Sequence, residues 1–334
     1  MQIKNDNNID PLFLKLHERY NEQRQESVES NKNTELWQSR ISVTELINPP
    51  QMGILKKYND HRIDKQLNDL LPSILGNSLH EALSLTFDTE NYPNDHREVR
   101  LFQQYKDFDD PQLSGQPDRI FQETSKTRNF KNVGTVWVKG EWCIQDYKFT
   151  GAYSTYKPKQ EWVEQLNCYA YLVRKGVDKY GDNLGIKIDR LFVTAIVRDW
   201  NSRNVGKPDY PESWVVDIDI PLWTEEEQEQ FIKDKMLIYK EAEIAYAETN
   251  YDSSQLPKCT DDERWSSGGG HAVMKPSRKT AVKLFDSERE AQEFAQTISG
   301  AYVESRPVTY TRCDRYCDVS NFCHQLRSEY DKER

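Results

Sequence analysis

An apolar run at residues 191–197, Leu-Phe-Val-Thr-Ala-Ile-Val, constrains the fold more than any other segment. Such a run fits a central, buried strand. Another strand is expected at 141–148, and helical periodicity covers 160–174 between the two. Further strands are expected to begin at Glu98 and to cover 117–122, 134–139 and 214–220. Strands that alternate with helices in this way predict an α/β fold.

The remaining segments suggest three regions. Residues 1–40 are polar and are expected to form an N-terminal arm, 41–250 to form the main domain with its flanking helix, and 251–334 to form a small C-terminal region. Residues 41 to about 90 are expected to be mostly helical, with one helix starting near Gly76. Thr224, followed by three glutamates, predicts a helix that runs to about 249. Strands at 271–275, 281–285 and 301–306, with a helix from Ser287 to about 298, predict a β-β-α-β arrangement.

Charged residues lie at the start of one expected strand and at the end of another, in a pattern typical of metal-dependent chemistry. Asp118 stands in the turn Gly-Gln-Pro-Asp, and Asp146, Tyr147 and Lys148 end the strand at 141–148. Residues two apart on a strand share a face, so Asp146 and Lys148 point together, while Tyr147 offers its backbone carbonyl. Two neighbouring carboxylates repel unless a cation lies between them, and their hard oxygens suit Mg²⁺ or Mn²⁺.

Two flanking segments add to this pattern. His80 ends a Gly-x-x-x-His sequence on a helix and could bring an imidazole to the same cation, which would favour Mn²⁺ over Mg²⁺. Glu98 is a weaker candidate for a further ligand. Gln165 and Tyr169 are four residues apart on the 160–174 helix, so they share one face and can reach a common target.

The four motifs together, Gly-x-x-x-His, Gly-x-Pro-Asp, Asp-x-Lys and Gln-x-x-x-Tyr, span residues 76–172 and resemble the RecB-like branch of the PD-(D/E)XK nucleases. The resemblance implies a restriction-endonuclease-like core with a mixed central sheet flanked by helices. It implies that His80, Asp118 and Asp146, with the Tyr147 carbonyl, are metal ligands. It also implies that Lys148 is the catalytic lysine and that Gln165 and Tyr169 lie along a DNA path.

The function implied by the resemblance is metal-dependent hydrolysis of DNA. We expect an exonuclease rather than an endonuclease, acting on single-stranded DNA or duplex ends in recombination, repair or phage replication, with a helicase or recombination protein as a possible partner. The alternative is a non-catalytic DNA-binding or scaffold subunit of a helicase–nuclease or CRISPR adaptation complex. The chain contains no Gly-Lys-Ser/Thr phosphate-binding motif, so it has no evident motor of its own.

Cysteines near the C-terminus form a second candidate site. Cys313, Cys317 and Cys323 lie within eleven residues, and Cys259 could supply a fourth thiolate. Four thiolates can hold either zinc or an iron–sulfur cluster. One distant cysteine with a tight trio resembles the [4Fe-4S] site of AddB-type and CRISPR-associated nucleases, although the distant cysteine of those proteins precedes the core and Cys259 follows it. His271 and His324 are possible substitute ligands.

Composition limits the remaining interpretations. The formal net charge of −10 argues against a protein that coats DNA non-specifically, so any DNA path is expected to be a local basic groove. Lys148, Lys157, Lys159 and Arg119 are candidates for its wall. Cys143 and Cys168 fall among apolar neighbours and are expected to be small buried residues. Without a secretory signal or an apolar span, we expect a cytoplasmic protein that does not enter the membrane.

Overall fold

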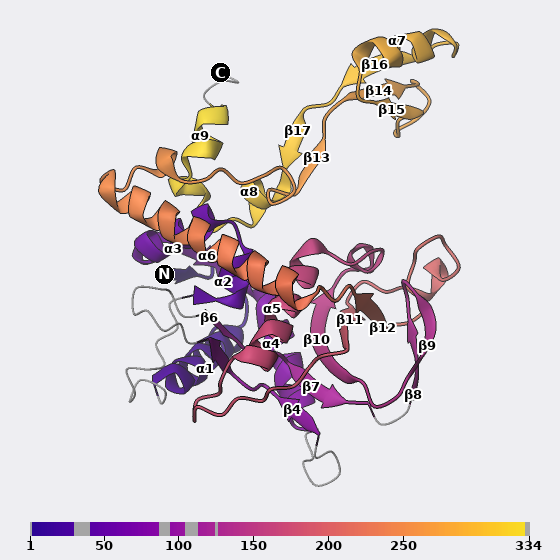
Figure 1. The fold of residues 1–334 in the computed structure, drawn as a ribbon. Coiled ribbons are helices and arrows are strands. Elements are labelled where there is room, and N and C mark those ends of the chain that lie inside the picture. The colour runs from indigo at the N-terminus through magenta and orange to yellow at the C-terminus, as the bar shows by residue number, and fades with distance from the viewer. Residues whose placement is uncertain (1, 30–40, 87–93, 104–112, 124–125, 331–334) are drawn as a thin grey trace. The chain divides into compact units, whose positions relative to one another are not determined.

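The computed structural model describes residues 2–29, 41–86, 94–103, 113–123 and 126–330. These residues form two compact units, the first comprising residues 1–50 and 61–244 and the second comprising residues 51–60 and 245–334 (Figure 1). The arm expected at residues 1–40 lies partly outside the described residues. Its described part contains strand β1 (Gln2–Lys4) and helix α1 (Pro11–Glu29).

A mixed sheet of seven strands is the centre of the first unit, so the α/β class is confirmed. In spatial order its strands are β4 (Asp95–Arg97), β7 (Arg119–Gln122), β10 (Trp142–Thr150), β11 (Arg190–Val197), β12 (Val215–Ile220), β8 (Lys126–Phe130) and β9 (Gly134–Val138). Strands β10 and β11 are parallel, and each has an antiparallel neighbour on its other side, β7 and β12 respectively. The apolar run at 191–197 is therefore a central strand, as predicted.

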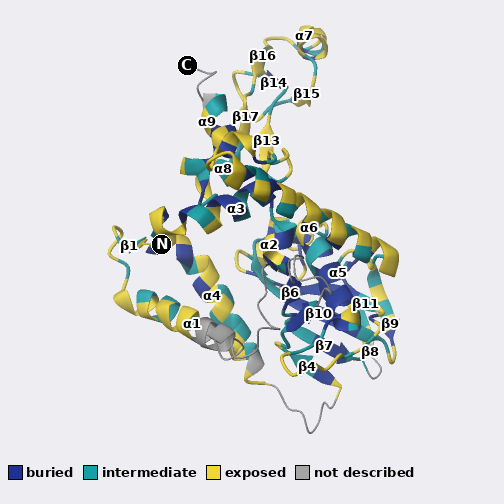
Figure 2. Ribbon diagram, turned by 60° about the vertical axis from the view of Figure 1, so that its left-hand side comes forward, coloured by how far each residue is buried: buried dark blue, intermediate teal, exposed yellow. Residues whose placement is uncertain are grey.

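Helices flank this sheet. Helix α5 (Gln160–Lys175) connects β10 to β11, and α6 (Glu225–Glu248) follows β12. Thr224 and Glu227 cap α6 reciprocally, because the Thr224 hydroxyl accepts the Glu227 N–H at 3.2 Å and the Glu227 carboxylate accepts the Thr224 N–H at 2.8 Å. The buried side chains of β10, β11, α5 and the first part of α6 form the main core, which Figure 2 shows in dark blue. Cys143 and Cys168 are buried, as expected.

The N-terminal part of the first unit adds smaller elements. These are the three-stranded sheet of β2 (Ile41–Ser42), β6 (Leu113–Gly115) and β5 (Leu101–Gln103), the short helix α2 (Val43–Ile47), strand β3 (Asp64–Gln66) paired with β1, and helix α4 (Leu67–Ser84). Helix α4 begins at Leu67 rather than near Gly76, so the predicted start is wrong. Leu67, Leu70 and Ile74 occupy one helical face and are buried, which extends the helix toward its N-terminus.

A second difference concerns the strand expected to begin at Glu98. The structure has two short strands instead, β4 before Glu98 and β5 after it. Glu98 itself has a φ of +52°, in the left-handed region that breaks a strand.

The second unit begins with most of α3 (Pro50–Asn59) and continues from the end of α6. Strands β13 (Ser266–Gly268) and β17 (Val308–Tyr310) form a two-stranded ribbon. Between them lie β14 (His271–Met274), β15 (Lys283–Phe285), α7 (Glu288–Gln296) and β16 (Tyr302–Ser305), whose strands form a sheet in the order β15-β14-β16. Helices α8 (Thr311–Arg315) and α9 (His324–Tyr330) follow.

Three consecutive glycines join the ribbon to this small sheet. Gly268, Gly269 and Gly270 all have positive φ, between +74° and +81°. A Cβ on Gly270 would stand 2.5 Å from the carbonyl oxygen of Phe285, so a side chain there is excluded by space as well as by conformation. Across the described part of the chain, no helix is long and apolar enough to cross a membrane.

Candidate metal centres

Strand β10 positions an acidic and a basic side chain on the same face of the sheet. The Asp146 carboxylate is 2% exposed and forms an ion pair with Lys148 Nζ at 2.7 Å. This contact confirms the predicted shared face, since residues two apart on a strand project together. The charge pair therefore lies at the edge of the apolar core rather than on an open surface.

Asp118 completes the edge of β10 where its pairing with β7 stops. The last antiparallel pair joins Gln145 to Arg119, and beyond it the Asp118 carboxylate accepts the Tyr147 N–H at 2.7 Å. The side chain thus replaces the missing strand partner. Because the N–H and C=O of one strand residue point to the same edge, the Tyr147 carbonyl also faces the Asp118 side.

One group of potential metal ligands stands out among the described residues. Ligand atoms of His80, Glu98 and Asp118 lie within 4.8 Å of one another. His80 Nδ1 is 3.4 Å from Asp118 Oδ1 and 3.9 Å from Glu98 Oε1. An imidazole with two carboxylates suits a divalent cation such as Mn²⁺. Asp146 is not a member of this group, although the sequence placed it in the ligand set.

The local backbone holds Glu98 in place. Its left-handed conformation is uncommon for a residue with a side chain. The Glu98 N–H donates to the Asp118 carbonyl at 3.3 Å, and Gln116 Nε2 donates to Glu98 Oε2 at 2.8 Å. Strained backbone of this kind is concentrated at functional sites, where surrounding contacts maintain it. The turn that carries Asp118 therefore also orients Glu98.

The charges of this group depend strongly on one another. Burial, followed by the negative charge of Asp146, raises the pKa of Asp118 to about 8. Burial alone would lower the pKa of His80, but the carboxylates of Glu98, Asp118 and Asp146 raise it overall. Burial also opposes the charge of Lys148, yet Asp146 raises the pKa of this lysine, which stays an ammonium. Ionisation of Asp118 beside Asp146 is therefore unfavourable in this structure, and a bound cation would offset its cost.

Helix α5 contributes a hydrogen-bonded link to the lysine. Lys148 Nζ donates to Gln165 Oε1 at 3.0 Å, and Gln165 Nε2 donates to the Tyr169 hydroxyl at 3.0 Å. The resemblance places Tyr169 along a DNA path, but its side chain is buried, so it orients Gln165 instead. Gly115 leaves room for the Tyr169 ring, because a Cβ at position 115 would come within 2.9 Å of it.

The basic residues proposed for a DNA groove differ in their contacts and in their exposure to solvent. Arg119 is engaged within the protein, since it pairs with Asp95 at 2.7 Å, donates to Gln145 and stacks on the Phe121 ring. It is therefore not a free cation for DNA. Lys157 is exposed and Lys159 is half-buried, on the segment that joins β10 to α5.

The four cysteines near the C-terminus gather around one pocket of the second unit. Cys259, Cys313, Cys317 and Cys323 all line it. Neither His271 nor His324 is among the described residues that line it. The distant cysteine therefore joins the trio in space, as the sequence predicted.

The surroundings of these thiols raise the pKa of two of them. Burial, with the acidic Glu263 and the other thiols, raises the pKa of Cys259 to about 12, and burial raises that of Cys317 to about 11. Cys259 and Cys317 thus keep their protons unless a metal neutralises the thiolates. Four sulfur donors around one space fit an iron–sulfur cluster or zinc.

Two polar residues that the sequence did not indicate also contact the thiols. Gln51, on α3, is 2% exposed, and its Oε1 accepts from Cys259 Sγ at 3.5 Å and from Cys323 Sγ at 3.4 Å. Arg264 is buried, and its Nε donates to Cys313 Sγ at 3.5 Å. Glu329 forms an ion pair with Arg264 and holds its guanidinium in place.

Comparison with known proteins gives little further information. No protein-family model matches the chain, and no curated protein matches it. Among solved structures, the crystal structure of SSO0001 is similar over 64% of this chain and 83% of that chain, with 15% sequence identity and a TM-score of 0.38. A similarity this low establishes neither a family nor a function.

Proposed function

We propose that this chain is a Mn²⁺- or Mg²⁺-dependent deoxyribonuclease of the RecB-like branch of the PD-(D/E)XK nucleases, with a restriction-endonuclease-like core. The observation that carries the proposal is the convergence of four sequence motifs on one edge of β10. There Asp118 bonds to the Tyr147 N–H, lies beside His80, and neighbours the Asp146–Lys148 ion pair. Four motifs spread over 97 residues, 76–172, thus supply side chains to one place, as a shared catalytic task would require.

The donor set fits a divalent cation. His80, Glu98 and Asp118 would hold it, and Asp146 with the Tyr147 carbonyl would complete the negative surroundings. When bound, such a cation supplies charge that stabilises a phosphodiester during hydrolysis and lowers the pKa of water.

The other residues of the site have separate tasks in this proposal. Lys148 remains charged beside Asp146, so its ammonium can donate hydrogen bonds to a phosphate oxygen or to the attacking water. Gln165 accepts from this ammonium and fixes its direction, and Tyr169 in turn fixes Gln165. Lys148 is therefore the catalytic residue, whereas Gln165 and Tyr169 are positioning residues.

The second unit is proposed to hold a [4Fe-4S] cluster through Cys259, Cys313, Cys317 and Cys323, with zinc as the alternative. The shared pocket and the four sulfur donors support this assignment. Metal bound there would stabilise the fold of the unit, because cysteines separated by dozens of residues would be linked. Purification without air distinguishes the two cases, since a brown protein with iron and sulfide indicates the cluster and a colourless protein with stoichiometric zinc indicates the alternative.

The substrate proposed for the first site is DNA, as single strands or duplex ends, in recombination, repair or phage replication. A helicase or recombination protein is the proposed kind of partner, and the cytoplasm the proposed location. The chain would act from the end of a strand as an exonuclease.

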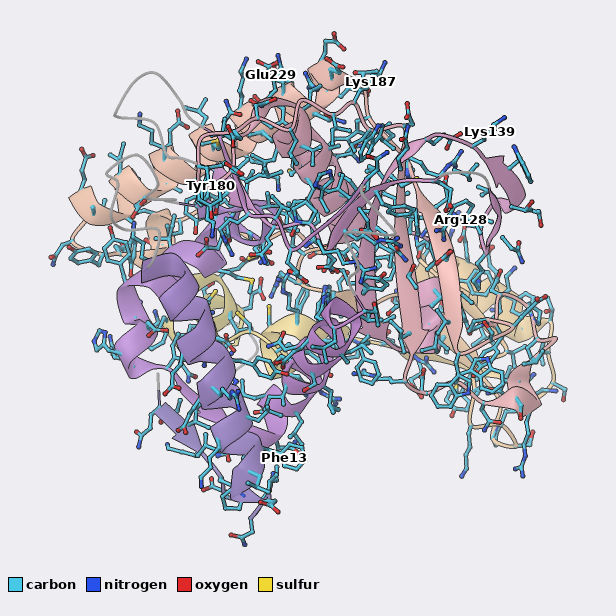
Figure 3. The ribbon with its side chains drawn as sticks, turned by 90° about the horizontal axis from the view of Figure 1, so that it is seen from below. Phe13, Arg128, Lys139, Tyr180, Lys187 and Glu229 are labelled. Carbon is cyan, nitrogen blue, oxygen red and sulfur yellow. The ribbon has the colours of Figure 1, made fainter. Side chains whose placement is uncertain are left out.

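The test is digestion of end-labelled DNA with Mn²⁺ by purified wild-type protein and two variants. Lys148→Met keeps an aliphatic side chain of similar length but removes the ammonium, and it should slow cleavage by about two orders of magnitude or more. Lys139→Met is the matched control, because Lys139 is exposed on the turn before β10 (Figure 3). Undiminished Mn²⁺-dependent digestion by Lys148→Met, or no digestion by correctly folded wild-type protein, would overturn the proposal.

A further inference from the structure

An exposed pair of tyrosines lies on the segment that leaves the strand of the proposed catalytic lysine. The short 3₁₀ helix Ala152–Thr155 follows β10 after Gly151. Tyr153 is 83% exposed, and its ring centroid is 5.3 Å from that of Tyr156, with an angle of 56° between the planes. An exposed aromatic ring adds little to the apolar core, so the Tyr153 ring is available to a ligand.

The segment is anchored rather than loose, which fixes where these rings are presented. Asp199 Oδ1 accepts the Ala152 N–H at 2.7 Å, and the buried Thr155 hydroxyl donates to the Ala152 carbonyl at 2.7 Å. The segment therefore presents two tyrosines from a backbone held by hydrogen bonds on both sides.

Lysine side chains lie near the pair, which stands on the same segment that the Asp199 carboxylate anchors. Lys131 Nζ lies 5.4 Å from the centroid of the Tyr156 ring. The chain carries no acidic residue between Asp146 and Glu161, although its formal net charge is −10, and the same stretch contains Lys148, Lys157 and Lys159. Aromatic rings beside a locally basic stretch are the combination that binds single-stranded nucleic acid, because bases stack on the rings and lysines contact the phosphates.

We propose that Tyr153 and Tyr156 form a stacking platform for unpaired bases, which makes single-stranded nucleic acid the preferred ligand of the first unit. The proposal rests on the nuclease function for its biological meaning, since the platform would guide a strand toward Lys148. Tyr153 lies five positions after Lys148, so their Cα atoms are at most about 18 Å apart. A strand stacked on the platform could therefore reach Lys148. Duplex DNA offers no unpaired base to these rings, so it would bind more weakly.

A matched control exists in the same unit. Tyr180 is 76% exposed, and Lys179 Nζ is 5.0 Å from its ring centroid, so it also combines an exposed ring with a lysine (Figure 3). It follows the C-terminal end of α5, whereas Tyr153 precedes the N-terminal end. A helix of 16 residues separates the two positions, which corresponds to about 24 Å.

The experiment measures binding of a fluorescent single-stranded oligonucleotide by anisotropy in EDTA, so that cleavage does not interfere. We expect Tyr153→Ala to weaken binding about tenfold, Tyr153→Phe to retain it because the ring remains, and Tyr180→Ala to leave it unchanged. An oligonucleotide with abasic sites should bind the wild-type protein as weakly as normal DNA binds Tyr153→Ala.

Several results would overturn the proposal. They are equal affinity of Tyr153→Ala and wild type, equal affinity of normal and abasic strands, tighter binding of duplex than of single strands, or no binding at all. If Tyr153 instead contacts another protein, the oligonucleotide affinities will not depend on it. The nuclease proposal is tested by a different result. Binding that depends on Tyr153, without any Mn²⁺-dependent cleavage, would support the stacking platform and refute catalysis.

Discussion

Replacing Asp118 by asparagine should stabilise the metal-free protein at alkaline pH, although it removes a proposed metal ligand. Burial and the charge of Asp146 raise the pKa of Asp118 to about 8, from an ordinary value of 3.8. The folded state therefore keeps this proton at pH values where the unfolded chain has released it. The free energy of unfolding consequently falls as pH rises from about 4 to about 8.

The size of the effect follows from the same shift. Each tenfold change in a protonation equilibrium corresponds to about 1.4 kcal/mol. Local relaxation and water penetration reduce the cost of ionising a buried carboxyl, so we expect Asp118→Asn to stabilise the first unit by on the order of 2 kcal/mol at pH 8 and by little at pH 4. For a unit of this size, that corresponds to a rise of about 4–8 °C in melting temperature. The asparagine can still accept the Tyr147 N–H through its Oδ1.

The assay is thermal unfolding in EDTA at both pH values, followed by circular dichroism. Asp189→Asn is the matched control, because Asp189 also accepts a backbone N–H on β10, that of Trp142 at 2.9 Å. It should not stabilise the protein at either pH. Mn²⁺ should raise the melting temperature of the wild type and much less that of Asp118→Asn, since only the former keeps the charged ligand. A melting temperature of Asp118→Asn at or below that of the wild type at pH 8 would refute the reasoning.

Two further substitutions test the packing and the thiols. Gly115→Ala should destabilise the first unit by about 1–3 kcal/mol, because the added methyl meets Leu172 and the Tyr169 ring, and urea unfolding that shows no change would contradict this. Cys259→Ala should lower the metal content per chain and the stability of the second unit, whereas the buried Cys168→Ala should leave the metal content unchanged; equal metal content in both variants would remove Cys259 from the ligand set.

Features set by local sequence were predicted well. The apolar run at 191–197 could be placed because its residues specify burial directly, and the shared face of Asp146 and Lys148 follows from strand alternation alone. The helix that carries Gln165 and Tyr169 was predicted from its periodicity, with bounds within one residue of those observed.

Features set by long-range contacts could not be predicted in the same way. Glu98 was predicted to begin a strand, but it has a left-handed conformation. That conformation depends on contacts with the Asp118 carbonyl and with Gln116, which the local sequence does not show. The contact of Gln51 with the thiols could not be predicted, because Gln51 lies 208 positions before Cys259 and an isolated glutamine on a helix is common. The strand order was equally hidden, because β8 and β9 join the far edge of the sheet beside β12.

We propose that His80, Glu98 and Asp118 form the cation site of a phosphodiesterase. Anomalous diffraction at the manganese edge, from a crystal of the full chain soaked in Mn²⁺, locates the ion directly. We expect a peak bounded by these three side chains in the wild type and none there in Asp118→Ala. No peak among them at saturating Mn²⁺, or an unchanged peak in Asp118→Ala, would contradict it.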